Sequence, residues 1–412
     1  MIIYYGLLIL IVGLGLWWGK DEKRGWPRAV YCLAVTLALA LTAGLRYGIG
    51  FDYRNYPPLF ETIRSLSWGE LPSYRYELGF SALSKLLMLI SSDLTFLYMV
   101  YALLMMGVVG YVIWRRSVMP WFSFFYFVTL AFFASAMNLL RQTFAAFIFL
   151  LAVPYLQKRR IVPYMLIVLL AASMHKTALL LIPVYFIARL PLNRYTGALY
   201  GGGTVLVFLF SDPIMHFAMR YVFSYYTEDT IYYNSSSFIY VMVPVALSAL
   251  LIALKGRLCK EDPDNIVYVN LMLYGGFFSL MMTRHYILER FSLYFVVTGL
   301  LSVPLLARTF RPQEGAVLED DGKFRSERAQ KLALRRWEKE QKQIYISVIT
   351  ALCLLCFIHF LISVNYKFHN VYPYYSIFSE EAKNQERIPY VPYWKEAEAA
   401  QRLENQGKAE NP

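Results

Sequence analysis

The chain has 412 residues, of which 58% are hydrophobic, 17% aromatic and only 17% charged. A soluble protein of this length would carry about a quarter charged residues, and many apolar runs here approach the roughly 20 residues that cross a bilayer. The composition therefore predicts an all-α polytopic membrane protein and excludes an ordinary soluble enzyme. The net charge of +12 does not indicate nucleic-acid binding, because the basic residues fall between the apolar runs, where the positive-inside rule puts them.

The first apolar run, residues 2–18, lacks the basic n-region and the small-residue cleavage site of a secretory signal peptide. It is therefore predicted to be a retained helix. Cys32, Cys353 and Cys356 lie in apolar runs, and Cys259 lies in a basic loop. Cys353 and Cys356 have C-x-x-C spacing without partner ligands, so the cysteines are interpreted as small packing residues rather than metal or redox centres.

We expect one helical transmembrane domain over residues 1–367, with about twelve transmembrane helices. A polar extracytoplasmic tail, partly disordered, is expected over residues 368–412. Residues 77–92 are amphipathic around Lys85 and fit a span, a re-entrant helix or an interfacial helix. The expected spans are residues 2–19, 29–45, 94–113, 119–136, 138–157, 161–174, 176–190, 196–211, 238–254, 266–283, 290–307 and 344–364.

The distribution of Lys and Arg predicts the orientation of the chain. With the N-terminus outside, 24 of the 40 Lys and Arg residues fall on the cytoplasmic side, including the basic loop 308–343. Within that loop, residues 326–343 favour a surface helix or a solvated connector. This orientation requires that residues 77–92 do not cross the membrane. It places loops 46–76 and 212–237 on the outer face, together with the polar residues between the spans.

Polar residues at the ends of apolar spans are functional candidates, because a charge near the middle of a membrane helix costs about 2.5 kcal/mol or more. Arg46, Asp52, Tyr53 and Tyr56 lie in a glycine-rich turn and just after it. Aromatic rings stack on the apolar face of a sugar and carboxylates accept its hydroxyl groups, so this loop suits a sugar site. The competing interpretation is an interfacial aromatic belt with an arginine that reaches the headgroups.

Two further segments carry polar residues beside apolar runs. Glu77 precedes the ambiguous segment, where it is either a helix N-terminal charge or a base or sugar ligand in a cavity. Asn138, Arg141 and Gln142 stand at positions i, i+3 and i+4, so they are predicted to share one face of a helix. An arginine near a helix N-terminus is well placed to hold a phosphate. The alternative for Arg141 is a side chain that only reaches the membrane surface.

The last two groups join pairs of apolar runs. His175 and Lys176 separate two short runs, which places the histidine at the membrane surface as a base or a diphosphate ligand. The alternative is a histidine that only packs against neighbouring side chains and has no functional role. Arg284, Glu289 and Arg290 lie at another hairpin, where an ion pair between Glu289 and either arginine is the competing interpretation. No P-loop, G-x-S-x-G, H-E-x-x-H or Rossmann fingerprint stands out in the chain.

These segments resemble the EpsG-type family of Wzy-like bacterial polysaccharide polymerases, which make O-antigen and exopolysaccharide. The matching segments are residues 46–56 (an R-x-G-x-D-Y-x-x-Y pattern with one inserted residue), Tyr76-Glu77-Leu78-Gly79, Asn138-Leu139-Leu140-Arg141-Gln142, Ser173-Met174-His175-Lys176 and residues 372–378. The resemblance implies a fold similar to the helical, GT-C-like membrane glycosyltransferases that act on polyprenyl phosphates.

The resemblance further implies that undecaprenyl-diphosphate-linked oligosaccharide is both donor and acceptor, and that units are joined at the outer leaflet of the bacterial inner membrane. A metal-independent, inverting transfer without a cofactor is expected, because arginines can stabilise the departing diphosphate. Besides the lipid bilayer, the expected partners are a flippase and a chain-length regulator. The expected roles are Asp52, Glu77 and His175 as candidate bases, Arg46, Arg141, Lys176, Arg284 and Arg290 as diphosphate ligands, and Tyr53, Tyr56, Asn138, Gln142 and Glu289 as sugar ligands.

Two rival functions share this chemistry. A lipid-linked oligosaccharide flippase would also hold a cationic cavity, but its polar residues should run along the depth of several helices, whereas here they crowd one end. A polysaccharide ligase catalyses almost the same transfer, and the sequence leaves that alternative open.

Overall fold

The structure is a computed structural model that describes residues 1–18, 25–221, 238–312 and 327–380. It is 80% helical, and no strand occurs among the described residues. An isolated antiparallel bridge joins Arg46 to Ser376. The predicted all-α class is confirmed.

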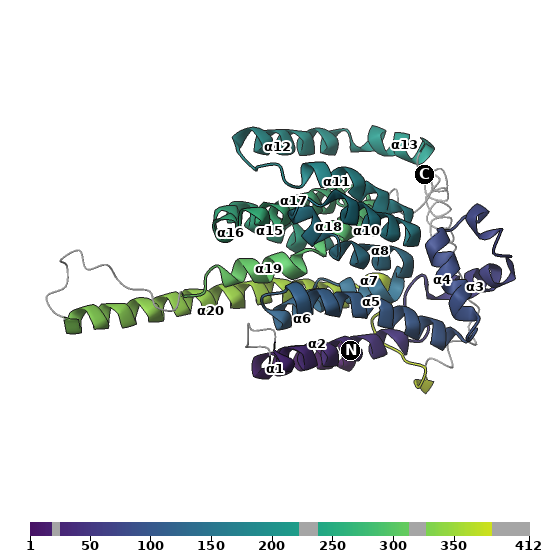
Figure 1. Cartoon of the computed structure of the whole chain (residues 1–412), viewed down its shortest axis with the longest axis horizontal. Helices are drawn as coiled ribbons and strands as arrows, with labels where there is room; N and C mark the ends of the chain where they lie inside the picture. Colours follow the sequence, from purple (N-terminus) through teal and green to yellow (C-terminus); the bar gives the residue numbers. More distant parts are fainter. Residues whose placement is uncertain (19–24, 222–237, 313–326, 381–412) are drawn as a thin grey trace, which may run out of the picture.

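Some predicted spans are built from shorter helices that follow one another closely, whereas α5 and α20 are longer than the spans predicted for them (Figure 1). In chain order they are α1 Ile2–Trp18, α2 Trp26–Gly44, η1 Tyr53–Asn55, α3 Tyr56–Ser65, η2 Leu71–Ser73, α4 Leu78–Met88, α5 Leu94–Arg116, α6 Pro120–Thr129, α7 Phe132–Asn138, α8 Leu140–Leu150, α9 Val153–Gln157, α10 Ile161–Met174, η3 Lys176–Leu180, α11 Leu181–Ile187, α12 Arg194–Leu209, α13 Ser211–Tyr221, α15 Phe238–Ala253, α16 Lys255–Glu261, η4 Pro263–Asn265, α17 Ile266–Met281, η5 Tyr286–Leu288, α18 Glu289–Val296, α19 Gly299–Arg308, α20 Glu327–Asn365 and η6 Phe368–Asn370.

Three described helical stretches, 26–44, 94–116 and 331–365, are long and apolar enough to cross a membrane. Four bent pairs raise that number to as many as seven if each pair is one span. These pairs are α6 with α7, α12 with the first part of α13, α15 with α16, and residues 286–296 with α19. Further apolar helices of 10–17 residues include α8 and α10. Length and composition therefore support a multi-span protein, while twelve spans stay a prediction.

Two spans that were predicted as continuous helices are sharply bent. The expected helix 119–136 bends by 55° between α6 and α7, because Ala131 adopts a left-handed backbone (φ 62°) that an α-helix does not contain. The expected helix 290–307 bends by 52° near Thr298, whose hydroxyl donates to the Phe295 carbonyl oxygen. These breaks place non-helical backbone inside the bundle.

The predicted surface helix 326–343 is, from Glu327 on, the first part of α20 rather than a separate element. No glycine or proline interrupts residues 327–365, so the backbone continues as one helix of 39 residues. At 1.5 Å per residue this helix is about 58 Å long, well beyond the roughly 30 Å hydrocarbon core. Accordingly, α20 projects far out of the bundle in Figure 1.

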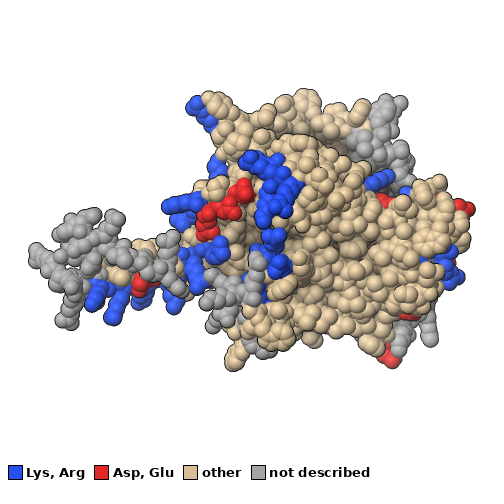
Figure 2. Space-filling model, in the orientation of Figure 1, with Lys and Arg blue, Asp and Glu red and all other residues tan. Residues whose placement is uncertain are grey.

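Basic side chains gather at one end of the bundle, here called the basic end. Arg28 at the start of α2 donates to the carbonyl oxygens of Ile113, Trp114 and Ser117 at the end of α5. Arg308 at the end of α19 pairs with Glu261 of α16. Figure 2 shows Lys and Arg clustered at the end where Figure 1 labels α16 and where α20 projects, whereas the middle of this face is almost free of charge.

The opposite end, here called the site end, carries α3 and α4 (Figure 1). Helices α2 and α5 are antiparallel, because Arg28 lies beside the end of α5 while Gly44 lies against Met99 near its start. Residues 46–93 therefore begin and end at the site end. Helix α4 has 11 residues and is about 16 Å long, too short to cross the hydrocarbon core.

The segment after α20 packs into the site end instead of forming a separate tail. Tyr4 donates to the carbonyl oxygen of Val371 at 2.6 Å, and Tyr374 donates to that of Thr42 at 2.8 Å. Phe368 and His369 are buried. The predicted tail thus contributes its first residues, 368–380, to the described fold; its remainder, like residues 222–237 of the predicted outer loop, lies outside the described residues.

Candidate functional site

Glu77 reaches the interior because α4 approaches the end of α10 at very short range. A Cβ added to Gly79 would lie 2.3 Å from Ser173 Oγ and 2.8 Å from its carbonyl oxygen. Only glycine permits that approach. It brings the residue before α4, Glu77, against the turn that follows α10, where His175 lies. Within the Tyr76-Glu77-Leu78-Gly79 segment, Gly79 therefore allows the helix contact that places Glu77 beside His175.

The Glu77 carboxylate is occupied by three donors. Arg141 Nη1 lies 2.5 Å from Oε2, while His175 Nδ1 and the Lys176 backbone N–H lie 2.9 and 3.1 Å from Oε1. The carboxylate is largely buried, with a side-chain exposure of 10%. Burial raises the pKa of Glu77, but the hydrogen bond from His175 and the positive charge of Arg141 outweigh it and hold the pKa at about 2. Glu77 is therefore an ionised anchor and a weak base.

His175 is oriented by that anchor. An ionised carboxylate only accepts hydrogen bonds, so Nδ1 carries the proton and Nε2 is left as an acceptor, an assignment from the hydrogen-bond network. Nε2 is buried and has no hydrogen-bond partner among the described residues. Burial lowers the pKa of His175, despite its bond to Glu77. The ring is therefore neutral near pH 7, with a free lone pair.

Asp52 lies on a tight turn that touches the break between α7 and α8. Gly50 has φ 97°, and a Cβ there would lie 3.0 Å from the Met137 carbonyl oxygen. The Asp52 backbone N–H donates to Asn138 Oδ1 at 2.9 Å, and Asn55 donates to the Asp52 carboxylate at 3.2 Å. Burial raises the pKa of Asp52, against the opposing charge of Arg290. This carboxylate is thus a stronger base than Glu77.

Asn138, Arg141 and Gln142 do not share one helix face, so that prediction is wrong. Helix α7 ends at Asn138, and Leu139 (φ −90°, ψ 65°) separates it from α8. As a result, Asn138 bonds to the Asp52 loop, Arg141 bonds to Glu77, and Gln142 donates to the backbone oxygen of Arg290 at 2.8 Å. The break sends the three side chains to different partners around one site.

The tyrosines of the Asp52 loop are packed rather than presented to solvent. Tyr56 is buried and accepts a hydrogen bond from the Leu140 backbone N–H at 3.0 Å. Tyr53 stacks on Tyr98 with ring centroids 4.7 Å apart, and Tyr98 donates to its backbone oxygen. Both tyrosines hold the loop in place, and their sugar-binding role stays a prediction.

The predicted diphosphate ligands are placed differently from one another. Arg141 is 21% exposed and lies over the Tyr76 ring. Arg290 acts electrostatically on both Asp52 and His175. The Lys176 side chain is exposed beside Glu77. These three cations lie around the carboxylates of Glu77 and Asp52, here called the carboxylate cluster.

Arg46 and Arg284 lie apart from that cluster. Arg46 is buried over the Tyr98 ring and donates to the Ala43 carbonyl oxygen, while its Nε and Nη2 have no hydrogen-bond partner among the described residues. Arg284 pairs with Asp212 at 2.7 Å on the partly exposed start of α13. The contacts of these two arginines do not join them to Glu77, and their diphosphate roles stay predictions.

His369, which sequence reasoning did not single out, completes the site. Its Nδ1 lies 3.0 Å from Asn138 Nδ2, and its Nε2 lies 2.9 Å from Ser135 Oγ and 3.1 Å from Glu289 Oε1. Glu289 therefore contacts His369, and its predicted sugar-binding role stays a prediction. A polar Lys-Phe-His-Asn run at the end of the last apolar span is the sequence signal that marks this position.

No group of three or more His, Cys, Asp and Glu side chains is arranged to hold a metal ion in the described part of the chain. One Asp-x-Asp pair, Asp262 and Asp264, lies at the basic end near Arg308. There the Asp262 carboxylate accepts the Asp264 backbone N–H at 2.9 Å and so closes a local turn.

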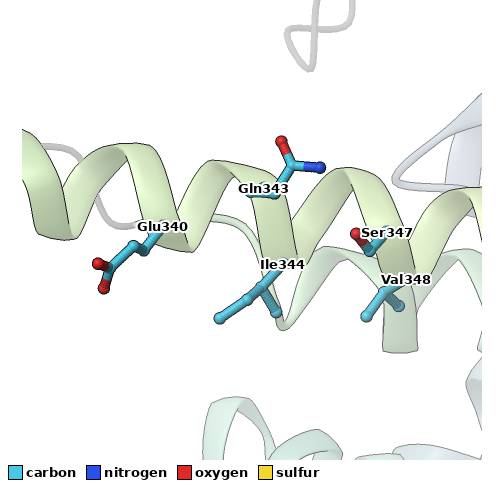
Figure 3. A pocket seen from close by; sticks show the side chains of 5 residues that line it. All are labelled: Glu340, Gln343, Ile344, Ser347 and Val348. Atoms are coloured by element: carbon cyan, nitrogen blue, oxygen red, sulfur yellow. The ribbon is translucent and has the colours of Figure 1, made fainter.

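A pocket on α20 is separate from this site. Figure 3 shows the five residues that line it, Glu340, Gln343, Ile344, Ser347 and Val348, all on the same helix. Val348 precedes the end of α20 by 17 residues, about 25 Å along the helix. The pocket therefore lies towards the basic end, and it presents no cation to an anionic substrate.

The fold and the site define an all-helical protein of membrane type, with a largely buried group of Glu77, Arg141 and His175 at one end of the bundle. The chain belongs to the EpsG family, whose model matches residues 29–318, more than half of the chain. The family prediction is thereby confirmed. No curated protein and no solved structure matches the chain.

Proposed function

We propose that this protein polymerises undecaprenyl-diphosphate-linked oligosaccharide repeat units into surface polysaccharide at the outer leaflet of the bacterial inner membrane. Membership of the EpsG family supports a polymerase-like role. The observation that carries the proposal is the cluster of Arg141, Glu77 and His175 beside Asp52, at the end of the bundle opposite the basic residues. By the positive-inside rule, that end faces the exterior.

Arg141 is the first diphosphate ligand in this proposal. Its guanidinium is held by Glu77 and stacked on Tyr76, so its donors are oriented before the substrate arrives. Arg290 and Lys176 add positive charge beside it. Preplaced cations stabilise the negative charge that grows on the departing diphosphate as the bond to the anomeric carbon breaks.

Asp52 is the proposed base. Direct displacement with inversion needs the base and the leaving group on opposite sides of the anomeric carbon. His175 shares the Glu77 carboxylate with Arg141 and therefore lies on the diphosphate side. Asp52 keeps a raised pKa and one side-chain hydrogen bond, from Asn55, so its carboxylate can accept the proton of the attacking sugar hydroxyl.

The test is elongation of purified undecaprenyl-diphosphate-linked repeat units by the protein in liposomes. We expect a ladder of products from the wild-type chain. Arg141→Lys should lose about a hundredfold in rate, equivalent to about 3 kcal/mol, because lysine cannot replace a bidentate guanidinium. The matched control is Arg64→Lys, an exposed arginine of α3 that contacts Ser92, which should retain the wild-type rate.

The rival functions predict other products. A flippase would move the lipid-linked unit across the bilayer without lengthening it, and a ligase would transfer finished glycan once to a separate acceptor. Either result with the wild-type protein, or an unchanged ladder from correctly folded Arg141→Lys protein, would contradict the proposal. Candidate partners in the cell are the flippase that supplies the units and a chain-length regulator.

A further inference from the structure

The hydrogen bonds around His369 determine which of its ring nitrogens carries the proton. The Asp52 backbone N–H can only donate, so the Asn138 atom that faces it at 2.9 Å is the amide oxygen. The Asn138 amide nitrogen then faces His369 Nδ1 at 3.0 Å and must donate to it. His369 Nδ1 is therefore an acceptor, and the ring proton lies on Nε2.

The other side of the ring agrees with that assignment. His369 Nε2 faces two oxygens, Ser135 Oγ at 2.9 Å and Glu289 Oε1 at 3.1 Å. The Ser135 hydroxyl already donates to the Ala131 carbonyl oxygen at 3.0 Å, so towards His369 it is an acceptor. Both oxygens thus accept from Nε2–H, and all the donors and acceptors in this set are matched.

The segment that carries His369 also holds the Asp52 turn directly. The Gly50 backbone N–H donates to the Asn370 carbonyl oxygen at 2.9 Å. Lys367, His369 and Asn370 all have left-handed backbone angles, with φ of 50°, 58° and 56°. Such angles persist in non-glycine residues only where surrounding contacts hold them. Here those contacts end on the turn that presents Asp52.

We propose that His369 is a positioning residue, which holds the Asp52 carboxylate in place through Asn138 and is itself oriented by Glu289. The inference rests on the proposed function for its catalytic consequence. It adds a residue from outside the segment that the family model matches, residues 29–318. The contact between His369 and Asn138 joins the segment after the last helix to the break between α7 and α8.

Two conservative variants separate the hydrogen bond of Nδ1 from that of Nε2. In His369→Asn, the side-chain oxygen can take the place of Nδ1 and accept from Asn138, but the amide does not reach Glu289. In His369→Gln, the amide nitrogen can take the place of Nε2 and donate to Glu289, while the Nδ1 position is lost. His369→Ala removes both hydrogen bonds. Tyr366→Phe, which alters an exposed side chain nearby, is the control.

The first readout is independent of activity. Hydrogen exchange of a peptide that contains the Asp52 amide should be faster in His369→Ala and His369→Gln than in wild type, because the acceptor Asn138 is released. His369→Asn and Tyr366→Phe should exchange at the wild-type rate. Equal exchange in the Asn and Gln variants would overturn the positioning role and leave His369 as a packing residue.

The second readout is elongation of the lipid-linked repeat unit. The rate kcat should fall by roughly tenfold in His369→Ala and His369→Gln, the scale of one lost hydrogen bond, while KM for the donor stays near wild type. His369→Asn should restore most of kcat. If exchange responds as expected but the wild-type protein does not elongate, the proposed function fails and the hydrogen-bonded link stands. If wild type elongates and the Asn and Gln variants do not differ, the link fails alone.

Discussion

At the scale of the residue, the basicity of each carboxylate depends on how many hydrogen-bond donors already contact its oxygens. Glu77 has both carboxylate oxygens engaged, by Arg141 and by His175 with the Lys176 N–H. Asp52 accepts one side-chain hydrogen bond, from Asn55. Two carboxylates that look equivalent as sequence motifs therefore differ in basicity. In the proposed reaction, Glu77 is a positioning residue for His175 and Arg141, and Asp52 is the group that takes up the proton.

The pH dependence of elongation distinguishes these carboxylates. A general base must be ionised, so the rate falls as the pH drops through its pKa. Because the pKa of Asp52 is raised above its ordinary value of 3.8 and that of Glu77 is held at about 2, we expect kcat/KM to decline at a pH above the range of an ordinary aspartate. Glu77 stays ionised throughout that decline.

Replacement of Asp52 by asparagine tests the same assignment. Asp52→Asn should bind the lipid-linked unit normally and lose about two to four orders of magnitude in turnover, and the acid limb should vanish from the residual rate. Substrate binding and turnover of the purified variant would be measured beside those of His175→Gln. Near-normal turnover in Asp52→Asn, together with a loss in His175→Gln, would assign the base to His175 Nε2 instead.

At the scale of the element, the site is assembled where helices stop. Helix α7 ends at Asn138, α10 ends at Met174 just before His175, and α4 begins just after Glu77. A continuous helix would distribute these side chains around its circumference. A broken one lets neighbouring residues point to different partners while the apolar parts of both segments remain packed.

Gly79→Ala tests the close approach of α4 to α10. The added Cβ would overlap both the side chain and the backbone oxygen of Ser173, so the helices must separate and Glu77 must move away from His175. We expect a lower melting temperature, by an amount that corresponds to about 1–3 kcal/mol of overpacking, and loss of elongation. Both are measured on detergent-purified protein.

A control glycine lies on α5. Gly107 is also helical, but no heavy atom lies within 4 Å of the position of its added Cβ. Gly107→Ala should therefore keep its activity and gain slightly in stability, because alanine favours the helix. Equal behaviour of the two variants would show that the α4–α10 approach does not hold the site together.

At the scale of the whole molecule, the two ends of the bundle carry different charges. Arg28, Arg257 and Arg308 lie at the end with α16, and the contacts of Asp52, Glu77 and His369 lie at the other. The uncharged middle of Figure 2 separates the two ends on the face shown. An apolar belt between two polar ends is typical of a membrane protein. In the proposed orientation the basic end faces the cytoplasm and the site end faces the exterior.

Thiol labelling tests that orientation. In a chain whose four cysteines are replaced by alanine, Ser67→Cys at the site end and Gly256→Cys at the basic end introduce thiols at exposed positions. An impermeant maleimide should label the Ser67→Cys protein in intact spheroplasts and the Gly256→Cys protein only after lysis. The reverse pattern would place the site in the cytoplasm and remove the basis for an outer-leaflet reaction.

The sequence by itself determined the class, the family and most of the polar groups of the site. Apolar runs, basic loops and short motifs such as Tyr76-Glu77-Leu78-Gly79 are local features that need no knowledge of packing. Hydropathy placed a span boundary between residues 136 and 138, next to the break at Leu139. It could not locate the break at Ala131, because the residues on both sides of that break are equally apolar. It also treated residues 327–343 and the last span as separate elements, whereas they form one helix, because nothing in that stretch stops a helix.

Only the tertiary structure decided which groups meet. Glu77 and His175 are 98 residues apart in the chain, and Asn138 and His369 are 231 apart. Whether such side chains touch depends on how close two backbones come, and a glycine such as Gly79 controls this through a contact that no local pattern records. The occupied state of Glu77, the freer carboxylate of Asp52 and the link through His369 follow from that packing, because a carboxylate becomes an anchor or a base according to the donors that surround it.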